Sequence, residues 1–268
     1  MQSETLDEEA GFGKLPFDIY VLERWDYSRA AEQDQQQWDD LARAWLALDA
    51  RGRHPYHELS RTRQATPTPA EIERVLAPHQ TVRERNLSLR TELGRYAPVW
   101  LRTCYSPELT DTYASWHSQD LGQVLGHYTQ ILDNEAVYAS CAGDWSRVLL
   151  RVPAIADTVR YVYETDAALQ ADDWEPPGPG EEFKMPVFEA KCKEKTLLFL
   201  IDEEALRAGL IKILWLDIHG NCVWENRLNP RKKLEFAGRM HDGGSLGDLY
   251  EDYEDEEMYE SGAVLDIS

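Results

Sequence analysis

Two short apolar runs, each closed by an aspartate, form the clearest pattern in the chain. The first covers 197–201 and stops at Asp202, and the second covers 211–216 and stops at Asp217. Runs of this length, bounded by charge, indicate strands that are buried on both faces. The acids and alanines between them predict two helical turns, which Gly209 is placed to end.

The second run continues into a turn and a further strand pattern. Residues 219–221, His-Gly-Asn, supply turn chemistry, and Cys222, Val223 and Trp224 follow as strand residues. We therefore predict a hairpin over 211–228.

The amino-terminal half carries helical and strand signals. Partial alternation predicts a strand over 15–25, and apolar residues three and four apart predict a helix over 28–50. Residues 51–68 have no period and are interpreted as irregular. Thr68 begins a capping box that predicts a short helix over 69–77.

A second set of elements begins at Pro98. Residues 98–106 have the pattern of a strand, and Ser106-Pro107 predicts a helix start. Another helix is expected near 121–131 and another strand near 159–163, before a Pro/Gly-rich loop at 172–184.

This order of elements predicts an α/β or α+β fold, a mixed sheet with flanking helices whose central buried strands lie near 197–201 and 211–216. The expected organisation is a disordered acidic leader (1–13), a helical, arginine-rich region (14–97), an α/β core (98–240) and a disordered acidic tail (241–268). Whether the middle two are separate domains stays open.

Charge is concentrated at the ends of the chain. The net charge is −21; residues 1–13 carry four acids, residues 241–268 carry ten, and neither segment has a Lys or Arg. This balance disfavours binding to nucleic acid or to a membrane surface. The acidic start does not resemble a signal peptide and no apolar run has the length of a membrane span, so we expect a soluble cytoplasmic or nuclear protein.

Asp202, Asp217 and His219 are the candidate catalytic residues. Both aspartates directly follow buried strands, and ligands bind at the carboxyl ends of strands in open α/β sheets. If the strands were parallel, the two carboxylates would lie side by side, and repulsion would raise the pKa of one of them. The alternative is that each aspartate only caps a helix or closes a turn, and that His219 is an ordinary turn residue.

No cofactor or metal site is predicted. His54 and His57 form an HxxH pattern, but Pro55 between them disfavours a regular helical turn, and the four cysteines lack metal-binding spacing. No complete phosphate-binding loop is present.

Arginine is concentrated between residues 51 and 102. This stretch holds ten arginines, no lysine and five acids, so it is positive within an acidic protein. Arginine pairs with carboxylates and phosphates through two hydrogen bonds at once. The candidate binding residues are Arg51, Arg53, Arg61, Arg63 and Arg102. One hypothesis is that the acidic tail docks on this stretch or competes with an acidic partner for it; the alternative is that the two never meet.

The sequence therefore favours a non-catalytic binding or interaction protein with an acidic tail and a protein partner. The alternative is an accessory enzyme of small-molecule metabolism that uses aspartate and histidine for acid–base chemistry. Oligomeric state, and the identity of substrate or partner, do not follow from the sequence.

Overall fold

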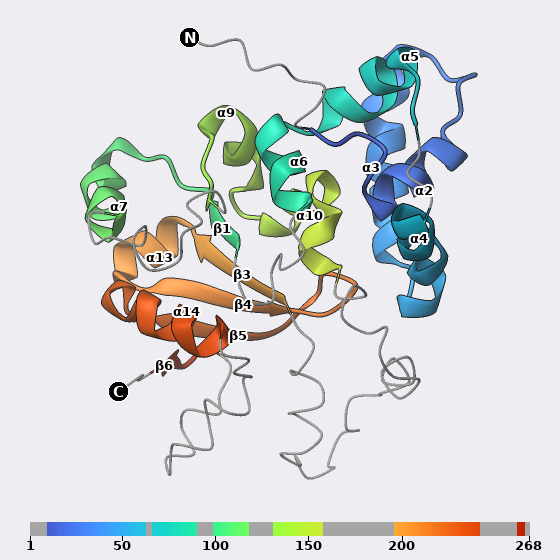
Figure 1. Cartoon of the computed structure of the whole chain (residues 1–268). Coiled ribbons are helices and arrows are strands. Elements are labelled where there is room, and N and C mark those ends of the chain that lie inside the picture. The colour runs from blue at the N-terminus through green and yellow to red at the C-terminus, as the bar shows by residue number, and fades with distance from the viewer. Residues whose placement is uncertain are drawn as a thin grey trace, which may run out of the picture. The chain divides into compact units, whose positions relative to one another are not determined.

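We analysed a computed structural model of the chain (Figure 1), in which residues 10–62, 66–89, 99–117, 131–157, 196–241 and 262–265 are described. The chain forms two compact units that interleave along the sequence. Unit 1 comprises Met1–Thr91, Ser146–Asp172 and Ile218–Gly220, and unit 2 comprises Glu92–Trp145, Asp173–Asp217 and Asn221–Ser268.

Unit 2 is built on a mixed six-stranded sheet with the strand order β2-β1-β3-β4-β5-β6 (Figure 1). Strand β1 is parallel to both β2 and β3, β4 is antiparallel to β3 and to β5, and β6 is parallel to β5. The strand bounds are β1 Val99–Arg102, β2 Ile131–Leu132, β3 Thr196–Ile201, β4 Ile211–Leu216, β5 Cys222–Leu228 and β6 Val264–Leu265.

The predicted fold class is confirmed, and so are its central strands. Every residue of β3 and β4 is buried, as the two apolar runs indicated. Helix α13 (Glu203–Ala208) fills the predicted helical turns, and Gly209 ends it with a φ of 71°. Because only glycine adopts such a φ at little cost, the sequence fixes the end of this helix.

Helices cover the sheet of unit 2 and complete its core. Helix α14 (Lys233–His241) lies against the sheet (Figure 1). The ring of its Phe236 lies 5.6 Å from that of Phe199 and 6.5 Å from that of Trp215. The predicted helix after Ser106 is present as η4 (Pro107–Leu109) and α7 (Thr110–His117). Leu109, Tyr113 and Trp116 of this helical segment are all buried in the core of unit 2.

Unit 1 is helical and has an aromatic core. Trp38 and Trp45, both fully buried, contact Phe17 and Tyr20 at ring distances of 5.2 to 5.7 Å. Its α-helices are α2 Pro16–Arg24, α3 Asp34–Leu46, α4 Ala50–Thr62, α5 Pro69–Glu71, α6 Val82–Ser88 and α10 Val148–Arg151. Shorter helical turns are η1 Ala31–Gln33, η2 Ile72–Leu76, η3 Ala77–His79 and η8 Pro153–Ala156.

Two predictions for unit 1 are wrong. The segment 15–25 forms helix α2 rather than a strand. The prediction failed because residues 16–21 are all buried, so the order of apolar and polar residues among them does not reveal the period. The segment 51–68 is helix α4 up to Thr62, although Pro55 lies inside it. Tertiary contacts of Arg53, Tyr56 and His57, all buried, outweigh the cost of that proline.

Capping explains other boundaries. The predicted capping box at Thr68 is present, with Thr68 Oγ1 accepting from Glu71 N at 3.3 Å. A second capping box, at Thr81 and Glu84, starts α6. The helix predicted over 28–50 begins only at Asp34, because Ser28 bonds Asp26 instead of capping it.

The tail region contains one described element, β6, which joins the edge of the sheet. The helix expected near 121–131, the strand near 159–163 and the loop at 172–184 lie outside the described residues, apart from Ile131 in β2. Within the described ranges, no helix has the length and apolar character needed to span a membrane.

Candidate functional site

Charged residues from five strands lie along one edge of the sheet in unit 2, namely the side at which β1, β2 and β3 end. Strands β2, β1 and β3 run parallel, so their carboxyl ends meet there, and they carry Asp133, Arg102 and Asp202. Strand β4 is antiparallel and begins at this edge, where Lys212 is its second residue; β5 ends there, and Arg227 is its last residue but one. These five residues and Glu204 of α13 are called the edge charge row below. Along the strand order its charges run negative, positive, negative, positive, and Glu204 lies between the last two cations.

Arg102 is the most constrained member of the edge charge row. Its guanidinium carbon lies 3.8 Å from the ring centre of Tyr113 and 4.5 Å from that of Tyr105. Its Nε donates to Cys104 O at 2.8 Å, and Nη1 is 3.6 Å from Asp133 Oδ1. Cation–π contacts and an ion pair thus hold the planar fork in one orientation, with 12% of the side chain exposed.

The two tyrosines act as neutral donors. Tyr113 donates to Asp133 Oδ2 at 2.5 Å, and Tyr105 donates to Arg102 O at 3.0 Å. Burial, and then the neighbouring Asp133 carboxylate, raise the pKa of both phenols above the ordinary value. Their hydroxyl protons therefore stay in place, and they position Arg102 and Asp133 rather than transfer protons.

The other half of the edge charge row is a chain of ion pairs. Lys212 Nζ lies 2.7 Å from Asp202 Oδ2 and also contacts Glu204, and Glu204 in turn lies 3.1 Å from Arg227 Nη2. The hydrogen bond and charge of Lys212 lower the pKa of Glu204. The charges of this half therefore pair within the protein.

Asp202 and Asp217 do not form the pair that parallel strands would have produced. Strands β3 and β4 are antiparallel, with Thr196 opposite Leu216, so the two aspartates lie at opposite ends of the sheet. Asp202 caps α13 by accepting from Ala205 N at 2.8 Å. Asp217 closes the β4–β5 turn by accepting from Asn221 N at 2.7 Å. His219 is exposed, and its Nδ1 lies 2.7 Å from Leu46 O within unit 1.

Most of the described arginines of the 51–102 stretch pair inside the protein. Arg53 and Arg85 are fully buried, so neither forms part of a surface. Four arginines each pair with an aspartate from outside the stretch: Arg53 with Asp157 (3.8 Å), Arg74 with Asp34 (2.9 Å), Arg85 with Asp18 (2.7 Å) and Arg102 with Asp133 (3.6 Å). These internal aspartates account for much of the local positive charge.

The remaining candidate binding arginines are Arg51, Arg61 and Arg63. Arg51 and Arg61 are exposed, and Arg61 pairs with Glu58 in the same helix at 3.3 Å. Arg63 lies outside the described residues. Of the five candidates, Arg102 is therefore the one that the structure holds in a fixed polar cluster at a sheet edge.

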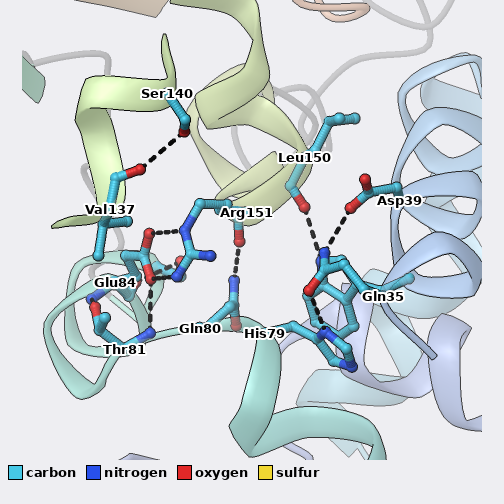
Figure 2. A network of polar contacts seen from close by, with 12 residues as sticks. Gln35, Asp39, His79, Gln80, Thr81, Glu84, Val137, Ser140, Leu150 and Arg151 are labelled. Carbon is cyan, nitrogen blue, oxygen red and sulfur yellow. Dashed lines mark hydrogen bonds and ion pairs between the residues drawn. The ribbon is translucent and has the colours of Figure 1, made fainter. Parts of the chain in front are cut away.

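A buried polar network in unit 1 serves the fold (Figure 2). Arg151 contacts both carboxylate oxygens of Glu84, at 2.7 and 2.8 Å, and its backbone carbonyl accepts from Gln80. In the same view His79 Nδ1 lies 3.1 Å from Gln35 Oε1. The imidazole is stacked on Trp38 at 4.7 Å, and burial lowers its pKa to about 4.

The histidines of the HxxH pattern do not form a metal site with other ligands. His57 Nε2 lies 2.9 Å from Asp157 Oδ2, in a buried pair beside Arg53. Among the residues that the structure describes, no group of three or more His, Cys, Asp or Glu is arranged to hold a metal ion. Cys192 lies outside the described residues.

Sequence reasoning missed Asp133, Tyr105, Tyr113 and Lys212 as members of this site. Asp133 follows a strand of two residues, which is too short to produce a pattern. Lys212 is the single charge inside an otherwise apolar run, and this interruption was a usable signal.

No protein-family model, curated protein or solved structure matches this chain.

Proposed function

We propose that this protein is a non-catalytic binding protein and that a partner protein docks on the edge charge row, with Arg102 as its anchor. The observation that carries the proposal is the fixed orientation of Arg102 between Tyr105 and Tyr113. Arginine and tyrosine are enriched among the residues that dominate binding energy at protein interfaces. Because the guanidinium is already held in place, little side-chain entropy is lost when a partner binds.

The charge pattern supports recognition of a protein rather than of nucleic acid. A phosphate backbone needs a uniformly positive surface, whereas Asp133, Asp202 and Glu204 alternate here with the cations. Alternating charges suit a protein partner whose own charges alternate in the opposite sense, since such complementarity sets register and rejects other partners. Proteins with acid–base pairs at the matching spacing are the expected partners.

The same geometry gives little support to the enzyme alternative. Asp202 already accepts from Ala205 N and from Lys212, and its side chain acts as cap and ion-pair partner. A general base needs a carboxylate or imidazole that can reach a substrate proton. Asp217, the other candidate, lies at the far end of the sheet.

The test compares full-length wild type with Arg102→Lys in quantitative capture of partner proteins from the source cell. Lysine keeps the charge but loses the planar fork and the stacking, so we expect at least a tenfold loss of any bound partner. The matched control is Arg83→Lys, because Arg83 is exposed and lies in α6 of unit 1.

Equal recovery of every protein by wild type and Arg102→Lys would overturn the proposal. Thermal unfolding of both variants must first show that each is folded. If a protein is lost from Arg102→Lys and retained by Arg83→Lys, its affinity for the purified chain is then measured by calorimetry.

A further inference from the structure

A different surface, the outer edge of β5, goes beyond the proposed function. Strand β6 occupies it through a parallel pairing in which Arg227 lies opposite Val264 and Leu228 opposite Leu265. Arg227 N donates to Ala263 O at 2.8 Å, and Gly262 N donates to Glu225 O at 2.7 Å. The pairing covers two registered residues, which is short for a strand.

One side chain of β6 supplies the apolar contact. Leu265 is 4% exposed and belongs to the core of unit 2, whereas Val264 is 49% exposed. The site therefore selects one aliphatic residue pointing inward, and backbone hydrogen bonds supply the remaining contacts. This combination is how a sheet edge recognises an extended peptide.

A long stretch of chain separates β6 from the preceding described element. Helix α14 ends at His241, and residues 242–261, twenty in number, carry nine acids and no lysine or arginine. Strand β6 pairs through two registered residues and buries one side chain, so a competing strand has few contacts to replace. A segment from another protein that binds this edge can therefore compete with β6.

We propose that the β5 edge is a binding site for an extended strand of a partner protein, and that β6 is the resident strand that the partner displaces. The partner segment carries an aliphatic residue at the position of Leu265. An acidic residue follows it, because β5 is followed a few residues along the chain by the exposed Arg231 and the partly exposed Lys232.

The experiment uses the full-length chain and a labelled peptide with the sequence of residues 260–268, ESGAVLDIS. Two variants release β6 by different means. Leu265→Asp removes the anchor, and Gly262→Val places a branched residue at a φ of 96°, which disfavours the approach to the strand without touching the core. Val264→Ala is the control, because that side chain is half exposed.

We expect both variants to bind the peptide about tenfold or more tighter than wild type, because β6 no longer competes. Val264→Ala should bind like wild type, and a peptide with Leu265→Asp should not bind any of them. Circular dichroism and thermal unfolding confirm that the variants are folded.

Two results would overturn the proposal. One is failure of both folded variants to bind the peptide. The other is concentration-dependent dimerisation of wild type, in light scattering, that Leu265→Asp abolishes, because the occupant would then be the strand of a second copy. Neither result bears on Arg102, since these variants leave the Arg102 cluster unchanged.

Discussion

Asp18 and Arg85 are the most deeply buried ion pair among the described residues, with both side chains fully shielded from water. The guanidinium contacts both carboxylate oxygens, at 2.9 and 2.7 Å, and also donates to Ala10 O and Gln80 Oε1. Asp18 in turn accepts from Gly13 N at 2.8 Å. Each charge depends on its partner, because a single buried charge is far more costly than a satisfied pair.

We therefore expect Asp18→Asn to lower the free energy of unfolding by about 3–5 kcal/mol, because Arg85 would keep a buried charge without its carboxylate. Urea unfolding of the purified chain measures the change. Glu58→Gln, which breaks the exposed pair with Arg61, should cost less than about 1 kcal/mol. Similar losses in the two variants would contradict this account of the arginine-rich stretch.

His79 predicts a specific pH dependence of stability. Burial lowers its pKa from 6.5 to about 4 in the folded state. As the pH falls, His79 is therefore protonated near pH 6.5 in the unfolded chain but only near pH 4 in the folded chain. The stability that neutral His79 supports is complete above pH 6.5 and is lost as the pH falls toward 4.

We expect wild type to lose about 2 kcal/mol more than His79→Phe between pH 7 and pH 5, from the linkage between the two pKa values. Phenylalanine keeps a flat ring against Trp38 and removes the titration. Urea unfolding at the two pH values measures the difference. Equal losses in both proteins would show that His79 titrates normally.

At the scale of elements, hydrophobic pattern predicted the strands better than the helices. Strands β3 and β4 follow from apolar runs because both of their faces are buried, and α13 follows from its caps. Helix α2 was predicted as a strand because it is buried on nearly all sides, which hides its helical period. Helix α4 was missed because tertiary contacts, which the sequence does not display, tolerate Pro55.

The candidate site was predictable in part, because only some of its residues lie beside strands that the hydrophobic pattern reveals. Asp202 follows a recognisable strand, so the sequence alone placed it at a candidate ligand edge, whereas Arg102 was a candidate only as a member of the arginine-rich stretch. Asp133 follows a two-residue strand, and its meeting with Arg102 depends on a parallel pairing between distant segments. Such pairing is a property of topology that local pattern does not contain.

Two substitutions of Asp202 test whether its side chain stabilises the fold as the cap of α13. We expect Asp202→Ala to cost about 1–2 kcal/mol of unfolding free energy, because α13 loses its cap. Asp202→Asn should cost less than half of that, since asparagine also caps helices. The exposed neighbour Glu203 provides the control variant Glu203→Gln. Equal effects of alanine and asparagine in urea unfolding would argue against a capping role.

At the scale of the whole molecule, the excess negative charge is concentrated at the two ends of the sequence, whereas many charged residues of the two units pair with one another. The sequence left open whether the tail docks on the 51–102 stretch; the one described element of the tail, β6, pairs with β5. The hypothesis that other parts of the tail reach the arginines stays a prediction, because residues 242–261 lie outside the described residues. Both proposed binding surfaces belong to the sheet of unit 2.

The most direct measurement is in-cell photo-crosslinking with p-benzoylphenylalanine placed at Glu203, which is exposed in α13 beside the edge charge row. The control position is Tyr27, which is 48% exposed in unit 1. We predict a discrete crosslinked partner protein from position 203 that disappears when Arg102 is changed to Lys, and none of the same mass from position 27. Crosslinking that is unchanged by Arg102→Lys, or no crosslinked protein from position 203, would contradict the proposed function.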